Sequence, residues 1–322
     1  MINKRLDYLD IAKGIGILLV VLGHIYGNNN VFHIWIYSFH MPLFYFISGI
    51  TFKTNKYNNV LNLLNNKIKS LGIPYIVFNI LSLILNLIFI NYSRENFILG
   101  ILYMFLFTGY GAMWFLPSLL IVQIIFYLID KYISKEVIKK IIFLSIFIVT
   151  YILSKFNYNI IMLVFYRAFI GLIFFAAGNY LFNYIENKKV KYSEILFLLF
   201  INLITCFING KIGLWELRLN NIILYFISSI TGTIFLIYTC KKIKNNKLLE
   251  YIGINSLIVM CTHQIIIELI SKITSIKEYT TGIVPILLFI IVILIEIPIL
   301  KFVNNHKWLI GKLNKVEINL YS

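Results

Sequence analysis

Two ionisable side chains, Lys13 and His24, lie in one apolar stretch near the N-terminus and are the first candidates for chemistry. They are 11 residues apart, which in an α-helix is about 20° beyond three full turns, so both project from one face with His24 about 16 Å further along the axis. An imidazole can take a hydroxyl proton near neutral pH. The alternative is that Lys13 reaches the lipid headgroups while His24 hydrogen-bonds a backbone carbonyl.

Further ionisable side chains occur inside apolar runs, where each costs about 2.5 to 3.5 kcal/mol on membrane insertion and so marks a candidate site. His40 precedes Pro42, which removes a backbone donor and kinks a helix. That stretch is either part of a site or a packing seam with a buried histidine. Arg167 and His263 each fit a role in a site or a buried hydrogen bond.

The composition identifies the kind of protein that must position these groups. Hydrophobic residues make up 60% of the 322 residues, charged residues only 13%, and the mean hydropathy is +0.86. These values exclude an ordinary soluble domain and a disordered chain. The net charge of +16 would suggest nucleic-acid binding in a soluble protein, but in a membrane protein it first indicates basic cytoplasmic loops. The sequence therefore predicts an integral membrane protein that does not bind nucleic acid.

Apolar runs long enough to cross a bilayer, separated by Lys- and Asn-rich breaks, predict an all-α polytopic protein with about ten transmembrane helices. The run over 96–108 is too short to cross and suits a re-entrant or interfacial segment. We expect one membrane-embedded domain over 1–322. The expected spans are 8–27, 31–52, 71–91, 112–130, 138–155, 159–182, 193–209, 219–240, 252–272 and 282–303.

The distribution of basic residues predicts the orientation. With the N-terminus in the cytoplasm, 22 of the 29 Lys and Arg residues fall on the inner side and 6 on the outer side, as the positive-inside rule requires. Both termini are then cytoplasmic. At these depths we expect Glu296 to pair with Lys13, and His33 and Glu268 to be interfacial groups near the outer surface.

Six motif segments follow one another along the chain. They are Arg5–Ile17 running on to His24, with Lys13 and His24 separated by ten residues; Phe39–Gly49; Met113–Pro117; Tyr166–Arg167 followed by Phe174–Gly178; Gly253–Ser256 with His263; and Glu296–Pro298. Together, in this order, they resemble the acyltransferase-3 family of membrane O-acyltransferases. The second segment most resembles the branch described as fucose 4-O-acetylase-like, where a histidine precedes Met-Pro.

One motif departs from the family pattern. Members commonly carry Arg-x-x-Arg before the Leu-x-x-Pro that opens the third helix, whereas here the matching positions are Lys67 and Ser70, with Lys69 beside them. Lysine binds phosphate as a point charge and lacks the bidentate fork of arginine. The contact with an acyl-CoA donor is therefore either weakened here or made by Lys67 together with Lys69.

The resemblance implies a multi-pass enzyme of the plasma or inner membrane that moves an acyl group, most simply acetyl, from cytoplasmic acyl-CoA to a hydroxyl of a cell-surface or lipid-linked carbohydrate. His24 would act as base or as acyl carrier, and Lys13 would meet an anionic part of the donor. No Cys/His motif has the spacing of a metal site. Second-tier candidates are Asp10, His40, Trp114, Arg167, His263 and Glu296.

Two other classes of function remain open. A glycolipid or polysaccharide exporter would use the buried ionisable groups to line a passage, and a membrane sensor or assembly subunit would carry out no chemistry. An exporter predicts that the glycan is missing from the outside altogether. A transferase predicts that the glycan is present and lacks only its acyl group.

Overall fold

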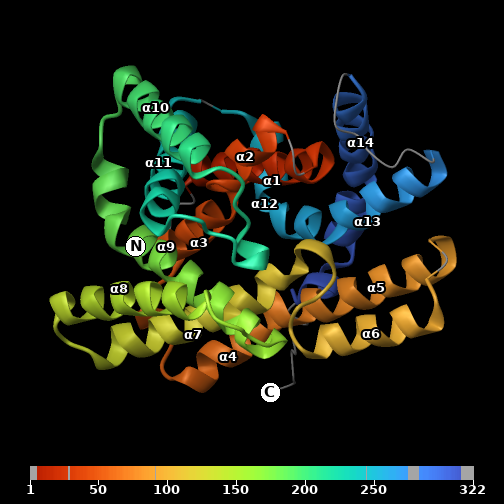
Figure 1. Ribbon diagram of the computed structural model, residues 1–322, viewed down its shortest axis with the longest axis horizontal. Helices are drawn as coiled ribbons and strands as arrows, with labels where there is room; N and C mark the ends of the chain where they lie inside the picture. The colour runs from red at the N-terminus through yellow and green to blue at the C-terminus, as the bar shows by residue number, and fades with distance from the viewer. Residues whose placement is uncertain (1–5, 28–29, 91, 244, 275–282, 313–322) are drawn as a thin grey trace, which may run out of the picture.

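The computed structural model describes residues 6–27, 30–90, 92–243, 245–274 and 283–312. These residues are helical, with a single isolated bridge between Gly213 and Arg218, so the predicted all-α class is confirmed (Figure 1). The longer helices are α1 (Asp7–Tyr26), α3 (His40–Thr51), α5 (Ile73–Phe89), α6 (Arg94–Phe105), α7 (Phe115–Tyr132), α8 (Glu136–Leu153), α9 (Ile160–Asn187), α10 (Tyr192–Asn209), α11 (Ile222–Lys242), α13 (Ser256–Thr274) and α14 (Val284–Asn305). The shorter ones are α2 (Val31–Tyr37), α4 (Val60–Lys67) and α12 (Lys247–Ile254), with one-turn elements η1 (Thr54–Lys56), η2 (Ile68–Gly72), η3 (Gly111–Trp114), η4 (Leu214–Glu216) and η5 (Lys307–Ile310).

Eight helices in the described residues are long and apolar enough to cross a membrane, against the ten expected. They are α1, the continuous helical segment Val60–Phe89 (α4, η2 and α5), the segment Gly111–Tyr132 (η3 and α7), α9, α10, α11, α13 and α14. The expected span 31–52 is divided into α2 and α3, and the expected span 138–155 is α8, whose first turns carry Glu136, Lys139 and Lys140. The cytoplasmic location of both termini stays a prediction, since the first five and last ten residues lie outside the described part of the chain.

The division between α2 and α3 has a local cause at Pro42. Proline has no N–H, and its ring excludes the carbonyl four residues earlier, which here belongs to Ser38. That carbonyl instead accepts a hydrogen bond of 2.8 Å from the Ser229 hydroxyl on α11. The chain turns at Ser38 and Phe39, and α3 begins at His40. The break therefore places His40 at a helix end inside the protein.

Helix α1 lies inside the bundle, where it packs against α12, α13 and α2 and also touches α3, α11 and α14 (Figure 1). Its contact with α12 depends on two glycines. A Cβ on Gly253 would lie 1.7 Å from the Asp10 carbonyl oxygen, and a Cβ on Gly14 would lie 2.1 Å from that of Leu249. Any larger side chain would push the helices apart.

The short helix α6 folds back along α5 and packs against it (Figure 1). Its 12 residues span about 18 Å at 1.5 Å per residue, well short of a hydrocarbon core of about 30 Å. The expected non-crossing segment over 96–108 is thus a short helix. The loop after it has three residues with positive φ, namely Phe107, Gly109 and Gly111. This loop leads the chain into η3 and the start of α7.

Candidate active site

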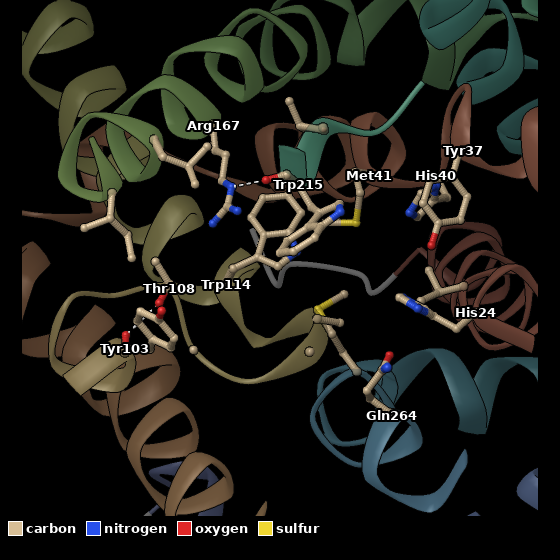
Figure 2. Close-up of a pocket in the computed structure, with 18 of the residues that line it drawn as sticks. His24, Tyr37, His40, Met41, Tyr103, Thr108, Trp114, Arg167, Trp215 and Gln264 are labelled. Carbon is tan, nitrogen blue, oxygen red and sulfur yellow. Dashed lines mark hydrogen bonds between the residues drawn. The ribbon is translucent and has the colours of Figure 1, made fainter. Parts of the chain in front are cut away.

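The described residues enclose a cavity of about 600 Å³ that brings together side chains from distant parts of the chain. Four of its lining residues, His24, His40, Trp114 and Arg167, were expected from sequence to belong to a site. Figure 2 shows them around one space, with His24 and His40 on one side and Arg167 on the other. The walls are supplied by helices α1, α2, α3, α6, α9 and α13, the one-turn elements η3 and η4, and the loop before η3.

A second imidazole lies directly beside His24. The rings of His24 and His263 have their centroids 5.1 Å apart, although the two residues belong to the first and the penultimate long helices. The Nδ1 atom of His263 is 2.7 Å from the Val259 carbonyl oxygen, one turn earlier in α13. Since a carbonyl only accepts, Nδ1 carries the hydrogen and the neutral ring keeps a lone pair on Nε2. That Nε2 atom is buried and has no hydrogen-bond partner among the described residues.

An aromatic side chain that the sequence did not single out connects the histidines of this wall. The ring of Tyr37 stacks on His33 at 3.7 Å, lies 4.6 Å from His40, and is 6.2 Å from His24. His40 hydrogen-bonds through Nδ1 to the Ile36 carbonyl at 3.0 Å. His33 was expected at the membrane interface, but it is only 3% exposed.

The opposite wall carries Arg167, which α9 places inside the protein with 2% of its surface exposed. Its Nε atom donates a hydrogen bond of 2.6 Å to the backbone carbonyl of Trp215 in η4. The guanidinium carbon lies 5.0 Å from the Trp114 ring and 5.5 Å from the Trp215 ring. A guanidinium within about 6 Å of two indole rings gains cation–π attraction from each of them. Arg167 was predicted as a candidate, but Trp215 was not.

A family model described as an acyltransferase domain matches residues 6–300, nearly the whole chain. The chain belongs to the acyltransferase-3 family. No curated protein and no solved structure matches it. The family assignment and the eight apolar helices together make this a membrane acyltransferase. The cavity around His24 is accordingly the candidate active site of the acyltransferase.

Lys13 and Glu296 do not pair as the sequence suggested. In the acyltransferase, the Lys13 ammonium group forms an ion pair of 2.6 Å with Asp10, one turn earlier on α1. The two carboxylate oxygens of Glu296 instead accept hydrogen bonds of 2.8 and 3.0 Å from the Thr262 hydroxyl on α13. Depth in the membrane was the basis of the expected pair, and depth does not determine which helix faces which. None of these four residues lines the cavity.

The two lysines expected to contact the donor also lie outside the cavity. The Lys67 ammonium group is 5.5 Å from the Phe52 ring and 5.8 Å from the Tyr57 ring, so aromatic faces surround it. Lys69 is exposed in the π-helical turn η2, against which η5 packs. Within the described ranges, no group of three His, Cys, Asp or Glu side chains is placed to hold a metal ion.

Three cavity residues, Tyr37, Trp215 and Gln264, were missed at the sequence level. Gln264 follows His263, and its side-chain amide donates to Glu268 at 3.2 Å. Glu268 also accepts a hydrogen bond from the Tyr110 hydroxyl, so this carboxylate belongs to the cavity wall and not to a simple interface. The available signal for Trp215 was a single tryptophan in a polar connection between two apolar runs.

Proposed function

We propose that this membrane acyltransferase moves an acetyl group from cytoplasmic acyl-CoA to a hydroxyl of a cell-surface or lipid-linked carbohydrate. The observation that carries the proposal is His24, which lines the cavity with a second imidazole 5.1 Å away. No side chain in the described residues forms a hydrogen bond with the His24 ring. Its nitrogens are therefore free for a substrate, as general base catalysis requires.

The His24 ring can carry the reaction as a base. One ring nitrogen takes the proton of the acceptor hydroxyl while that oxygen attacks the thioester carbonyl. The tetrahedral intermediate then expels the thiolate of CoA, which receives the proton back from the imidazolium. The other ring nitrogen carries hydrogen, and a small rotation of the neighbouring rings would let it donate to the lone pair of His263 Nε2, which is without a partner among the described residues. That bond would hold the His24 ring in the productive tautomer, as the third member of a triad does. His263 is a positioning residue in this scheme.

His24 can also carry the acyl group itself. In that route an unprotonated ring nitrogen attacks the thioester and forms an acyl-imidazole, and the acceptor hydroxyl then takes the acyl group from it. Both routes require the same histidine in the same cavity. They differ in whether a labelled acyl group stays on the protein when the acceptor is withheld.

The charge distribution supports a donor from inside and an acceptor from outside. In the predicted orientation the basic inner loops attract polyanionic acyl-CoA, and the cavity lies in the outer half of the membrane of the cell, near the segment that contains Trp215. The Phe39–Gly49 motif, which includes His40, supports the fucose 4-O-acetylase-like branch. Lys67, Lys69 and Lys13 belong to the inner side and are the proposed donor contacts.

The test compares His24→Gln with the native chain in cells and in isolated membranes. We expect the variant to insert normally and to lose acetyl transfer to envelope glycan, by at least about 100-fold if His24 is the base. The matched control is His306→Gln, since His306 is exposed at the end of α14. Mass spectrometry of the glycan gives the readout. Retained acetylation in His24→Gln contradicts the proposal, and a glycan missing altogether from the outside of cells that lack the protein supports the exporter instead.

A further inference from the structure

Arg167 has a buried positive charge that forms no ion pair with an acidic side chain in the described part of the chain. The residue is 2% exposed, and among the described residues the ion pairs do not include it. Removing a charge from water is costly unless a partner compensates it, and this holds most strongly within a membrane-spanning helix such as α9. The usual compensation by an aspartate or glutamate is absent from the described surroundings of the guanidinium.

The contacts of Arg167 with the described residues hold the guanidinium through one nitrogen. Among these residues, Nε alone is used, for the bond to the Trp215 carbonyl, and the rings of Trp114 and Trp215 lie beside the guanidinium. Figure 2 shows the side chain directed into the cavity with its two terminal nitrogens away from the helix. Those nitrogens present N–H donors in a rigid fork, the geometry that binds a carboxylate or phosphate through two oxygens.

The second charged residue of the cavity does not supply the missing partner. Glu268 accepts hydrogen bonds from the Tyr110 hydroxyl and from the side-chain amide of Gln264. It forms no ion pair with Arg167. The guanidinium charge is thus available to whatever enters the space, and Figure 2 shows it across the cavity from His24.

We propose that Arg167 binds an oxyanion, a carboxylate or a phosphate, on the same acceptor molecule whose hydroxyl reacts at His24. This inference rests on the proposed function and specifies its substrate class as an acidic carbohydrate. The anion belongs to the acceptor because Arg167 is joined to the segment with Trp215, which the distribution of basic residues places on the outer side. Two-point attachment, oxyanion at Arg167 and hydroxyl at His24, would select both the sugar and the position modified.

The native protein in detergent provides the first test, with glucose, glucuronate and glucose 6-phosphate as probes of similar size. Two of the four tryptophans of the chain flank Arg167, so binding is read from tryptophan fluorescence. We expect at least one charged probe to bind about tenfold or more tighter than glucose, since hydrogen bonds to charged groups are the strong ones. Tighter binding of glucuronate identifies a carboxylate, and of glucose 6-phosphate a phosphate. Equal binding of all three overturns the proposal.

Variants attribute the preference to one side chain. Arg167→Gln is expected to abolish it, and Arg167→Lys to retain part of it because the charge remains without the fork. The matched control Arg218→Gln removes a charge that is half exposed and paired with Glu216, and it should bind as the native chain does. An Arg167→Gln protein that melts normally and still prefers the charged probe overturns the proposal. If that variant does not fold, the Arg167→Lys comparison and the native probe series decide.

The same assay separates this inference from the proposed function. It uses no acyl donor, so it measures the acceptor subsite alone. His24→Gln should keep the preference for the charged probe while it loses acetyl transfer. If the protein prefers the charged probe but His24→Gln retains acetyl transfer, the oxyanion site is supported and the catalytic role of His24 is contradicted. If the protein shows no preference for the charged probe but His24→Gln abolishes acetyl transfer, the catalytic role is supported and the oxyanion site is contradicted.

Discussion

At the residue scale, the neighbouring imidazoles of His24 and His263 differ in what surrounds each ring. His263 is fully buried and tied through Nδ1 to its own helix, whereas His24 is half-buried and faces the open space. A ring whose tautomer is set by a backbone carbonyl is suited to orient its neighbour. A ring with free nitrogens is suited to meet a substrate. The difference in surroundings supports the reacting role that we propose for His24.

Substitution of His263 tests that division of roles. We expect His263→Leu to lower kcat for acetyl transfer by roughly tenfold or more while KM for the acceptor stays close to native, because the side chain orients His24 and does not line the cavity. His263→Asn keeps a hydrogen-bond acceptor and should recover part of the loss. The measurement is steady-state transfer in membranes at matched protein levels. Equal activity of the Leu and Asn variants would show that shape alone matters at this position.

The sequence predicted which residues line the cavity better than it predicted which residues contact each other. His24, His40, Trp114 and Arg167 were all expected from the sequence, because ionisable or motif residues inside apolar runs are few. Tyr37 and Trp215 were missed, since an aromatic residue in so aromatic a chain carries no signal until its neighbours are known. The pairing of Lys13 with Glu296 was wrong for two different reasons. The partner of Lys13 is Asp10, three residues earlier on the same helix, which helical spacing alone could have indicated. The partner of Glu296 is Thr262 on another helix, which only the packing of the helices could reveal.

At the element scale, hydropathy located most of the helices but not the interruption between α2 and α3. Pro42 indicated a weak point, but the Ser38 carbonyl that it leaves without a helical partner is satisfied by the hydroxyl of Ser229, which is 191 residues from Ser38. A local pattern cannot report such a partner. The contact between α1 and α12 is equally non-local, because Gly14 and Gly253 have meaning only as a pair.

Adding one methyl group at that contact should disturb the site from a distance. In Gly253→Ala the new Cβ would meet the Asp10 backbone, so α1 must shift and carry His24 with it. We expect overpacking to lower the free energy of unfolding by about 1 to 3 kcal/mol. This loss should appear as a lower melting temperature in detergent, together with reduced acetyl transfer. Gly72→Ala is the matched control, since a Cβ there would meet only the Ile68 side chain at 3.4 Å. Native stability of Gly253→Ala would contradict the close packing of α1 on α12.

At the scale of the whole molecule, the open question is how many helices cross the membrane. Helix α8 is not among the eight spans because its first turns are charged. Helices α2 and α3 are not among them because neither is long enough to cross. The distribution of basic residues nevertheless requires both segments to cross if every basic loop is to be cytoplasmic. The distribution of basic residues therefore predicts ten crossings, whereas helix length and apolarity support eight in the described residues.

Cysteine labelling measures this topology directly. The three native cysteines, at positions 206, 240 and 261, are buried, so they should contribute little background. With a membrane-impermeant maleimide on intact cells, Lys211→Cys and Asn157→Cys should react, whereas Lys135→Cys and Lys189→Cys should react only after permeabilisation. Labelling of Lys135→Cys and Asn157→Cys from the same side would show that α8 does not cross, and the inside count of basic residues would then have to be reassigned.

The separation of His24 and His263 along the chain has a consequence for biosynthesis. The first helix leaves the ribosome and enters the bilayer long before α13 is translated, so an unfinished chain holds His24 without its neighbour His263. If the proposed roles hold, a prematurely terminated product turns over acyl thioester more slowly than the finished protein does. Full activity then requires that insertion has reached α13.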